Sequence, residues 1–469
     1  MRRTSGAPEM RTLVRGGEIV TATRRFVGDI LIDGERIAAV EPSIAAPSGA
    51  SVIEAKGKFV FPGFIDPHVH IYLPFMGTHA KDTYESASRA ALVGGTTTLI
   101  EMVCPSRKED PVEALDLWMS KAVGKSACDF TFHMGVTRFD DSTAAKLASI
   151  VERGVASFKV FLAYKGAFGV DDAELYQTLA LAKRLGVIVT AHCENETLVA
   201  ERCKELIAAG KTGPGEHHTS RPPAVEAEGV NHLMTFAELT GAATYIVHLS
   251  CAEALERAMA ARRRGVRVNI ETLIQYLVLD KTDAERADFE GAKFVMSPPL
   301  RDKRNQPLLW KALADGEIDT VATDHAPFDF ETQKRMGEND FTKIPNGIPS
   351  LEHRVQLLYA RGVVEGRLSL HDLVRVASTN IAKIFGLYPR KGEIAPGSDA
   401  DLVVFDPEWR GTISAKHHSM ALDYSAFEGW PVEGRPETVL VRGALAVRDG
   451  AFVGRHGHGQ FLARKPTHP

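Results

Sequence analysis

Cysteine is scarce in this sequence, and so are long hydrophobic runs and any excess of charge. The five cysteines (Cys104, Cys128, Cys193, Cys203 and Cys251) are scattered, odd in number and without a Cys-x-x-Cys pair, which argues against a disulfide framework and favours a reducing compartment. No apolar run approaches the ~18–20 residues of a membrane span, and no apolar signal-peptide segment follows the basic N-terminus. A net charge of −4 favours neither nucleic acid nor an anionic membrane as a partner. We therefore expect a soluble, cytoplasmic protein.

Both ends of the chain are β-like. Near the N-terminus, the apolar runs Asp29–Ile32 and Ile37–Val40 are separated by an Asp33-Gly34 turn signal. Near the C-terminus, Asp401–Phe405 and Thr438–Val441 are separated by turns rich in glycine and proline. Two strand-rich ends around a different middle predict one small β-sandwich domain built from both termini, over residues 11–64 and 390–455.

The middle of the chain alternates strands with helices. Helical patterns such as Asp172–Gly186 and Ala252–Gly265 end in glycine, the expected helix stop, and two more helices are expected at Ser350–Arg361 and Ser369–Phe385. The predicted strands are Phe61–His70, Thr96–Val103, Phe130–Met134, Ser157–Ala163, Val187–His192, Ala243–His248, Val266–Thr272 and Ile318–Asp324. Eight strands alternating with helices predict an α/β fold, a (β/α)₈ TIM barrel over residues 65–389. The remaining residues, 456–469, are expected to form a mobile tail.

Polar residues gather at one end of these strands, where a barrel of this kind has its active site. The first strand ends in His68 and His70, the fifth in His192, the sixth in His248 and the eighth in Asp324. Residues two apart on a strand point to the same face, so His68 and His70 could bind one ion. Imidazole and carboxylate groups at converging strand ends suit Zn²⁺ or a similar divalent ion.

Each of these residues taken singly has an ordinary explanation. By chance, 17 histidines among 469 residues give about 0.6 His-x-His pairs, and one histidine in a strand is more often a satisfied core residue than a ligand. Their shared position at the strand ends favours a metal site. Lys159, inside the fourth strand, fits less well, because an ammonium cannot bind a cation and its burial is costly. From the residues alone, Lys159 is either a lysine whose head reaches the barrel rim or a modified one.

Longer motifs resemble one enzyme family. Residues 62–70 (Pro-Gly-Phe-Ile-Asp-Pro-His-Val-His), followed by Gly-Gly-Thr-Thr-Thr at 94–98, are similar to the opening of the amidohydrolase superfamily. Four further segments resemble dihydropyrimidinases and hydantoinases within it: Phe158–Lys165, Met296–Arg301, Thr323–Pro327 and Gly337–Gly347. The resemblance extends from about residue 11 to 450. It implies metal-dependent hydrolysis of the cyclic amide bond of 5,6-dihydropyrimidines or hydantoins to N-carbamoyl amino acids, in pyrimidine degradation, by a homotetramer.

The resemblance also implies how the metal site is completed. Lys159 would react with CO₂, and the resulting N6-carboxylated side chain would bridge two divalent ions, of which Zn²⁺ is favoured. The two histidines of the first strand and Asp324 would complete the more buried site, and His192 with His248 the other.

Catalytic and substrate-binding roles follow from the same resemblance. Asp324 would carry a proton from the attacking water to the leaving ring nitrogen, and Tyr164 would donate a hydrogen bond to the oxyanion. Ser297 and Asn346 would hold the imide edge of the ring, largely through backbone groups. Without the resemblance, Tyr164 would be interpreted as an aromatic residue at the barrel rim, and Ser297 and Asn346 would be interpreted as turn residues. The pocket for the exocyclic substituent would be lined by residues that core packing explains equally well: Leu73, Phe161 and Phe168.

Several alternatives stay open. A hydantoinase acting mainly on 5-substituted rings and an allantoinase are the enzymatic alternatives. The segments around Ser297 and Asn346 favour the dihydropyrimidinase and hydantoinase group over allantoinase, but they do not separate dihydrouracil from substituted hydantoins as the substrate. A dihydroorotase usually carries an arginine where this chain has Tyr72, which argues against that activity. In a different class, the collapsin response mediator proteins share the fold as non-enzymatic interaction proteins, but they lack the complete metal set that this chain keeps.

Overall fold

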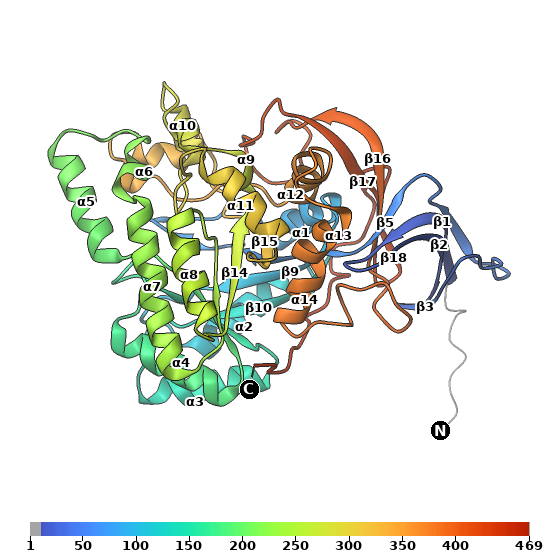
Figure 1. Cartoon of the computed structure of the whole chain (residues 1–469), viewed down its shortest axis with the longest axis horizontal. Coiled ribbons are helices and arrows are strands. Elements are labelled where there is room, and N and C mark those ends of the chain that lie inside the picture. Colours follow the sequence, from blue (N-terminus) through green and yellow to red (C-terminus); the bar gives the residue numbers. More distant parts are fainter. Residues whose placement is uncertain (1–10, 469) are drawn as a thin grey trace.

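The structure is a computed structural model that describes residues 11–468, and its larger part is a barrel of eight parallel strands (Figure 1). The sheet order is β15-β14-β13-β12-β11-β10-β9-β6. Val69 forms a parallel bridge with His325, and the His70 N–H donates to the His325 carbonyl over 2.8 Å, so the first and last strands meet at their C-terminal ends. The predicted (β/α)₈ barrel is confirmed. Its strands are β6 (Phe64–Val69), β9 (Thr96–Val103), β10 (Asp129–Gly135), β11 (Ser157–Phe161), β12 (Ile188–His192), β13 (Thr244–Ile246), β14 (Val268–Leu273) and β15 (Thr320–Ala322).

Helices cover the outside of the barrel, and α4 begins and ends at the signals expected from the sequence. In α4, the Asp171 side chain caps the Glu174 N–H, and Gly186 ends the helix in the left-handed conformation (φ 67°) that glycine adopts without strain. The helices are α1 (Tyr84–Val93), α2 (Pro111–Ala122), α3 (Asp141–Glu152), α4 (Asp172–Leu185), α5 (Glu196–Ala208), α6 (Glu216–Ser220), α7 (Pro223–Thr240), α8 (Ala252–Arg263), α9 (Ile274–Val278), α10 (Lys281–Ala284), α11 (Asn305–Ala314), α12 (Arg354–Leu357), α13 (Leu370–Val374) and α14 (Asn380–Ile384). Within residues 11–468, none of the helices is long and apolar enough to cross a membrane.

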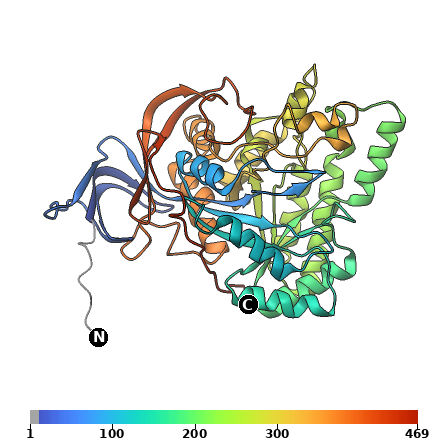
Figure 2. The same cartoon turned by 180° about the vertical axis from the view of Figure 1, so that it is seen from behind.

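The two ends of the chain form a second β unit beside the barrel, as predicted. Figures 1 and 2 show N-terminal (blue) and C-terminal (red) strands side by side in it. Strand β5 joins the two sets, pairing in parallel with β1 and antiparallel with β16. Buried apolar residues from both ends, such as Ile32, Val60 and Leu440, share one core. The strands are β1 (Arg11–Val20), β2 (Arg25–Asp33), β3 (Arg36–Glu41), β4 (Ser51–Glu54), β5 (Phe59–Pro62), β16 (Leu402–Thr412), β17 (Pro431–Val441), β18 (Ala444–Arg448) and β19 (Ala451–Phe452).

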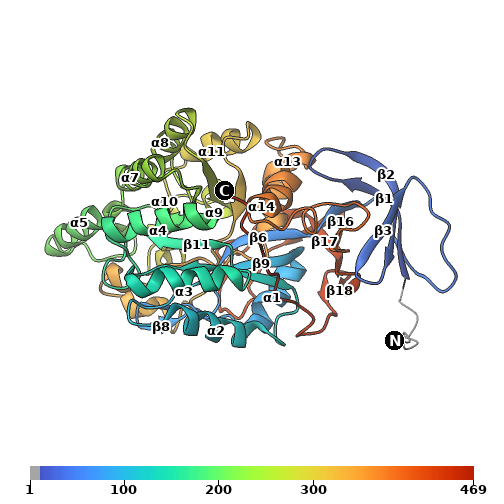
Figure 3. The same ribbon diagram turned by 90° about the horizontal axis from the view of Figure 1, so that it is seen from below.

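The C-terminal segment is packed against the barrel, so the prediction of a mobile tail is wrong for residues 456–468. It runs past the N-terminal ends of the barrel strands, where the Leu462 N–H donates to the Phe130 carbonyl and the Arg464 N–H to the Gly154 carbonyl. His468 lies between the ends of α4 and α14, bonded to the carbonyls of Gly186 and Ile384. Figure 3 shows the C-terminus beside α14. The glycines and histidines of this segment resemble a solvated tail in composition, but these tertiary contacts hold it. Pro469 lies outside the described residues.

Arg464 is the anchor of this segment, and its replacement is expected to destabilise the fold. The guanidinium is 2% exposed and bonds to neutral acceptors only, including Thr131 Oγ1 (3.1 Å), Ser157 Oγ (2.8 Å) and the Phe132 carbonyl. Arg464→Met would remove the donor that these buried acceptors share, lowering the free energy of unfolding by about 2–4 kcal/mol. Chemical denaturation should show this loss, while Arg455→Met, at an exposed position of the same segment, should change stability by less than about 0.5 kcal/mol. Equal stability of the two variants would contradict the anchoring role.

Candidate active site

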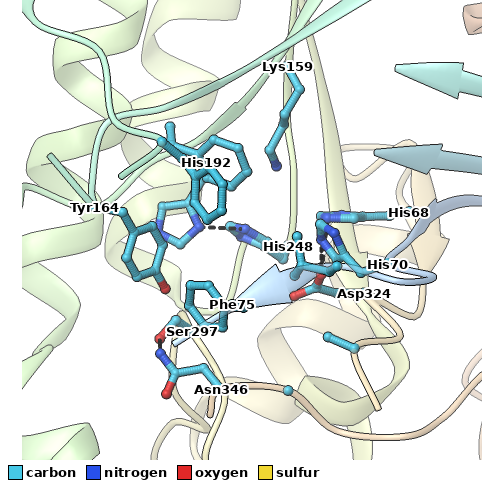
Figure 4. A pocket seen from close by; sticks show the side chains of 15 residues that line it. His68, His70, Phe75, Lys159, Tyr164, His192, His248, Ser297, Asp324 and Asn346 are labelled. Atoms are coloured by element: carbon cyan, nitrogen blue, oxygen red, sulfur yellow. Dashed lines mark hydrogen bonds and ion pairs between the residues drawn. The ribbon is translucent and has the colours of Figure 1, made fainter. Parts of the chain in front are cut away.

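One cavity lies at the C-terminal ends of the barrel strands, and every site residue predicted from the sequence lines it (Figure 4). It measures about 490 Å³, counting the part open to solvent. Phe75, Ala326 and Gly347 also line it and were not predicted. The predicted residues that it brings together are His68, His70, Leu73, Lys159, Phe161, Tyr164, Phe168, His192, His248, Ser297, Asp324 and Asn346.

The first and eighth strands build the tightest polar cluster in this cavity. His68 Nε2 and His70 Nε2 each lie 3.1 Å from Asp324 Oδ1, and one ligand atom from each of the three residues lies within 4.8 Å of the others. All three residues are buried. Asp324 adopts a left-handed backbone conformation (φ 47°), which is costly for a residue other than glycine and is typical of functional sites. This His-His-Asp cluster can hold a metal ion.

The carboxylates around His68 favour positive charge at its ring. Burial opposes protonation, but the carboxylates of Asp324 and Glu271 on either side raise the pKa of His68 to about 9. Burial likewise acts to raise the pKa of Asp324, yet the charge of His68 and the hydrogen bonds from the two histidines hold it well below its usual range. Two buried carboxylates therefore require a positive charge between them, and a divalent cation would meet that requirement in place of the proton.

His192 and His248 form a second pair beside the first. His192 Nδ1 lies 2.9 Å from His248 Nε2, and the His248 ring centroid lies 5.4 Å from that of His68. Burial lowers the pKa of both residues, so each presents a neutral imidazole, the form that binds metal ions. His248 also has a left-handed backbone (φ 42°).

Lys159 reaches into the space between the two pairs (Figure 4). It is fully buried, and its Nζ has no hydrogen-bond partner among the described residues, lying 4.7 Å from the centroid of the Phe161 ring. Burial lowers the pKa of its ammonium. The alternative of a lysine whose head reaches solvent at the barrel rim is therefore wrong. A buried amine with no partner in a cluster of metal-type ligands is unexplained unless it is modified or bound.

Two glutamates that were not identified from the sequence orient the histidines. Glu271 Oε1 lies 2.8 Å from His68 Nδ1 and accepts the His248 N–H at the same distance. Glu194 Oε2 lies 2.9 Å from His192 Nε2 and 2.6 Å from Arg221. Carboxylates in this position fix the ring orientation and tautomer of metal-binding histidines. Glu271 was detectable in principle, as an acidic residue inside the apolar seventh strand.

Across the cavity from the metal-type ligands, polar groups face an apolar wall. Asn346 Nδ2 donates to Ser297 Oγ over 2.9 Å, and the Tyr164 hydroxyl points toward this pair (Figure 4). Burial raises the pKa of Tyr164, which keeps its hydroxyl a donor at neutral pH. The wall consists of residues that pack on one another: Leu73, Phe75, Phe161 and Phe168.

Tyr72 does not line the cavity. Its ring packs against Tyr84, with centroids 6.2 Å apart, and beneath Lys121 Nζ at 4.7 Å. The left-handed backbone at this residue (φ 60°) accompanies a side chain that packs outside the lining of the cavity. Among the described residues that line the cavity, none is an arginine.

Comparisons with known proteins agree with this site. The Amidohydrolase family model matches residues 59–446. A D-hydantoinase of Geobacillus stearothermophilus is 46% identical over 97% of each chain, and a dihydropyrimidinase of Rattus norvegicus is 38% identical over 98% of this chain and 90% of its own. A solved D-hydantoinase (dihydropyrimidinase) from Thermus sp. superposes with a TM-score of 0.96 at 60% identity, covering 97% of this chain and 99% of the other. The chain belongs to the amidohydrolase family, within its hydantoinase and dihydropyrimidinase group.

Proposed function

We propose that this chain is a metal-dependent cyclic amide hydrolase that opens 5,6-dihydropyrimidines and hydantoins to N-carbamoyl amino acids, as in pyrimidine degradation. The observation that carries the proposal is one cavity in which four histidines, an aspartate and a buried lysine face a tyrosine, a serine and an asparagine. The similarity to D-hydantoinases and dihydropyrimidinases along nearly the whole chain supports it.

The residues of the cavity fit two divalent ions, for which we favour Zn²⁺. His68, His70 and Asp324 would hold one ion, and His192 with His248 the other. The unpartnered Nζ of Lys159 is placed to be carboxylated by CO₂, which would turn a cation among cation-binding groups into an anionic bridging ligand. Bound ions would supply Lewis-acid chemistry and lower the pKa of the attacking water.

The side chains around the cavity account for the proton transfers. Asp324, ionised at neutral pH, would accept a proton from the water as the water oxygen bonds to the ring carbonyl carbon. It would then donate that proton to the ring nitrogen as the C–N bond breaks. The Tyr164 hydroxyl would donate a hydrogen bond to the carbonyl oxygen as negative charge develops there. Ser297 and Asn346 would hold the adjoining ring amide.

The apolar wall favours rings that carry a hydrogen or an apolar substituent. Hydantoins substituted at position 5 with an alkyl or aryl group are therefore a second candidate class, since Leu73, Phe75, Phe161 and Phe168 would surround that group. A polar ureido group, as in allantoin, finds no polar partner on this wall. A substrate carboxylate, as in dihydroorotate, finds no arginine among the described lining residues.

Turnover of a ring panel tests this function. The panel contains dihydrouracil, dihydrothymine, hydantoin, a 5-substituted hydantoin, allantoin and dihydroorotate. We expect kcat/KM for the first four rings to exceed that for the last two by about 100-fold or more, because a site that leaves polar or charged substrate groups unpaired rejects them strongly. Hydrolysis of none of the rings would contradict the proposal.

Metal removal is expected to abolish this activity. Chelation should reduce turnover of dihydrouracil to background, and added Zn²⁺ should restore it, because the bound ions would lower the pKa of the attacking water. Elemental analysis should find about two ions per chain, in line with the ligand set. Less than one ion per chain, even after growth with added zinc, would revive the non-enzymatic alternative.

We also propose a homotetramer that acts in the cytoplasm. The five cysteines are all free, as expected in a reducing compartment. Light scattering of the purified protein would measure the assembly, and a monomer would contradict this part of the proposal.

A further inference from the structure

Lys334 is a second fully buried lysine. It lies outside the metal-type cluster, which consists of His68, His70, Lys159, His192, His248 and Asp324. It is 0% exposed and begins a short helical turn, Lys334–Gly337. Its Nζ donates to three backbone carbonyls, those of Val295 (2.9 Å), Pro345 (2.6 Å) and Gly347 (2.8 Å). An ammonium group has three N–H donors and no acceptor, so these three oxygens match its full donor capacity.

Among residues 11–468, no carboxylate forms an ion pair with Lys334. Burial alone lowers its pKa, and no neighbouring charge acts on it in the opposite direction. A neutral amine, however, offers two N–H donors and would leave one of the three carbonyls facing a lone pair. The three acceptors therefore favour the protonated form, held by neutral dipoles. Burying a charge in this way is costly. The presence of a lysine here therefore indicates a role that an apolar side chain could not perform.

The three carbonyls belong to the two segments that form the polar edge of the cavity. Val295 lies two residues before Ser297, while Pro345 and Gly347 flank Asn346 on either side. The Val295 carbonyl also accepts the Gly347 N–H over 2.9 Å. One nitrogen atom thus ties the Ser297 segment to the Asn346 segment, at the place where Asn346 Nδ2 meets Ser297 Oγ.

The charge of Lys334 also acts on the peptide groups that it touches. A cationic donor on a carbonyl oxygen draws electron density through the amide and makes the N–H of the same peptide a stronger donor, as in polarised hydrogen-bond chains. The peptide that carries the Pro345 carbonyl carries the N–H of Asn346. Charge-assisted hydrogen bonds are also shorter and stronger than neutral ones, which fixes the loop more firmly than an amide or hydroxyl would.

We infer that Lys334 is a positioning residue for substrate binding: its ammonium sets the spacing of the Ser297 and Asn346 segments and strengthens the donor capacity of the Asn346 backbone. The inference rests on the proposed function of this cavity. Because Lys334 lies outside the metal-type cluster, it should affect binding of the ring amide. It should affect neither metal content nor the proton transfers at Asp324.

Two substitutions and a control test this role. Lys334→Met keeps an unbranched side chain, one atom shorter than lysine, and removes all three donors, whereas Lys334→Gln, of similar reach to Met, keeps an amide donor. Lys343→Met removes an exposed lysine from the same segment. For dihydrouracil and hydantoin, we expect Lys334→Met to raise KM by about 10-fold or more, the loss of about one positioned charged hydrogen bond. We expect kcat to change by less than about 5-fold, Lys334→Gln to be intermediate and Lys343→Met to match wild type.

A second measurement does not depend on turnover. Hydrogen exchange followed by mass spectrometry should show faster exchange in Lys334→Met for peptides covering 295–297 and 345–348, with β6 and β12 unchanged. An unaltered KM and unaltered exchange would overturn the inference, as would a variant whose defect is a lower melting temperature alone. Failure of both Lys334 variants to fold would likewise assign the residue to stability and overturn it. If wild type hydrolyses no ring, the proposed function fails, and the exchange result still decides whether Lys334 fixes the two segments.

Discussion

Lys159→Ala is expected to lose both bound metal and hydrolysis of every cyclic amide substrate. The substitution removes the one side chain that reaches between the two histidine pairs, and with it the anionic bridge that carboxylation would create. Turnover should fall by about 1,000-fold or more, since the nucleophile would no longer be generated at neutral pH. Metal content is measured by elemental analysis and kcat with dihydrouracil, in parallel with Lys165→Ala, an exposed lysine of the same segment that should behave as wild type.

Chemical rescue separates the bridging role from a role in folding. The cavity left by Lys159→Ala is enclosed by buried residues of β11 and its neighbours, and a short carboxylic acid such as acetate or propionate should enter it and offer two oxygens to the metal ions. Partial return of metal and activity, saturable in the acid, is the expected result. Full activity in Lys159→Ala without any added acid would rule out the carbamate assignment.

Asp324→Asn is expected to slow turnover by about 1,000-fold while changing KM by only a few-fold. The amide preserves the size of the side chain and can still lie beside His68 and His70, but it cannot accept the proton of the attacking water. Because the pKa of the Asp324 carboxyl lies well below its usual range, wild type should keep its base ionised throughout the neutral and mildly acidic range. Single-turnover rates and metal content, measured together, distinguish loss of the base from loss of an ion.

Asp329→Asn is the control for this experiment. Asp329 is a buried carboxylate five residues further along, paired with Lys81 Nζ at 2.6 Å and absent from the described lining of the cavity. It should retain turnover close to wild type even if stability falls. A wild-type kcat in Asp324→Asn, with metal retained, would remove Asp324 from the proton-transfer role.

The sequence predicted those parts of the fold and site that depend on local pattern. Strand runs of the barrel and glycine-terminated helices are local features, and His68, His70 and Asp324 are found together because strand ends of a parallel barrel meet at one rim. The roles given to them stay predictions until they are tested. Lys159 needed the resemblance as well, since nothing in its neighbours along the chain distinguishes a buried lysine from one that reaches solvent.

Features that depend on long-range contacts were not predictable. Glu271 is far from His68 in sequence, so only the folded chain brings its carboxylate to that ring. Tyr72 follows His70 by two residues, but its backbone is left-handed and its ring packs beneath Lys121, outside the lining of the cavity. The C-terminal segment has the composition of a solvated tail, and the neutral acceptors that hold Arg464 lie on β10, β11 and the end of α14.

The β unit shared by both ends of the chain has a consequence for biosynthesis. Strand β5 emerges from the ribosome early, yet its antiparallel partner β16 begins only at Leu402. Until then, one edge of the N-terminal strands is open and can pair with another nascent chain, a known route to aggregation. Contacts so distant along the chain also slow folding. We therefore expect the yield of native protein to depend on chaperones and on expression temperature, and less on the stability of the finished barrel.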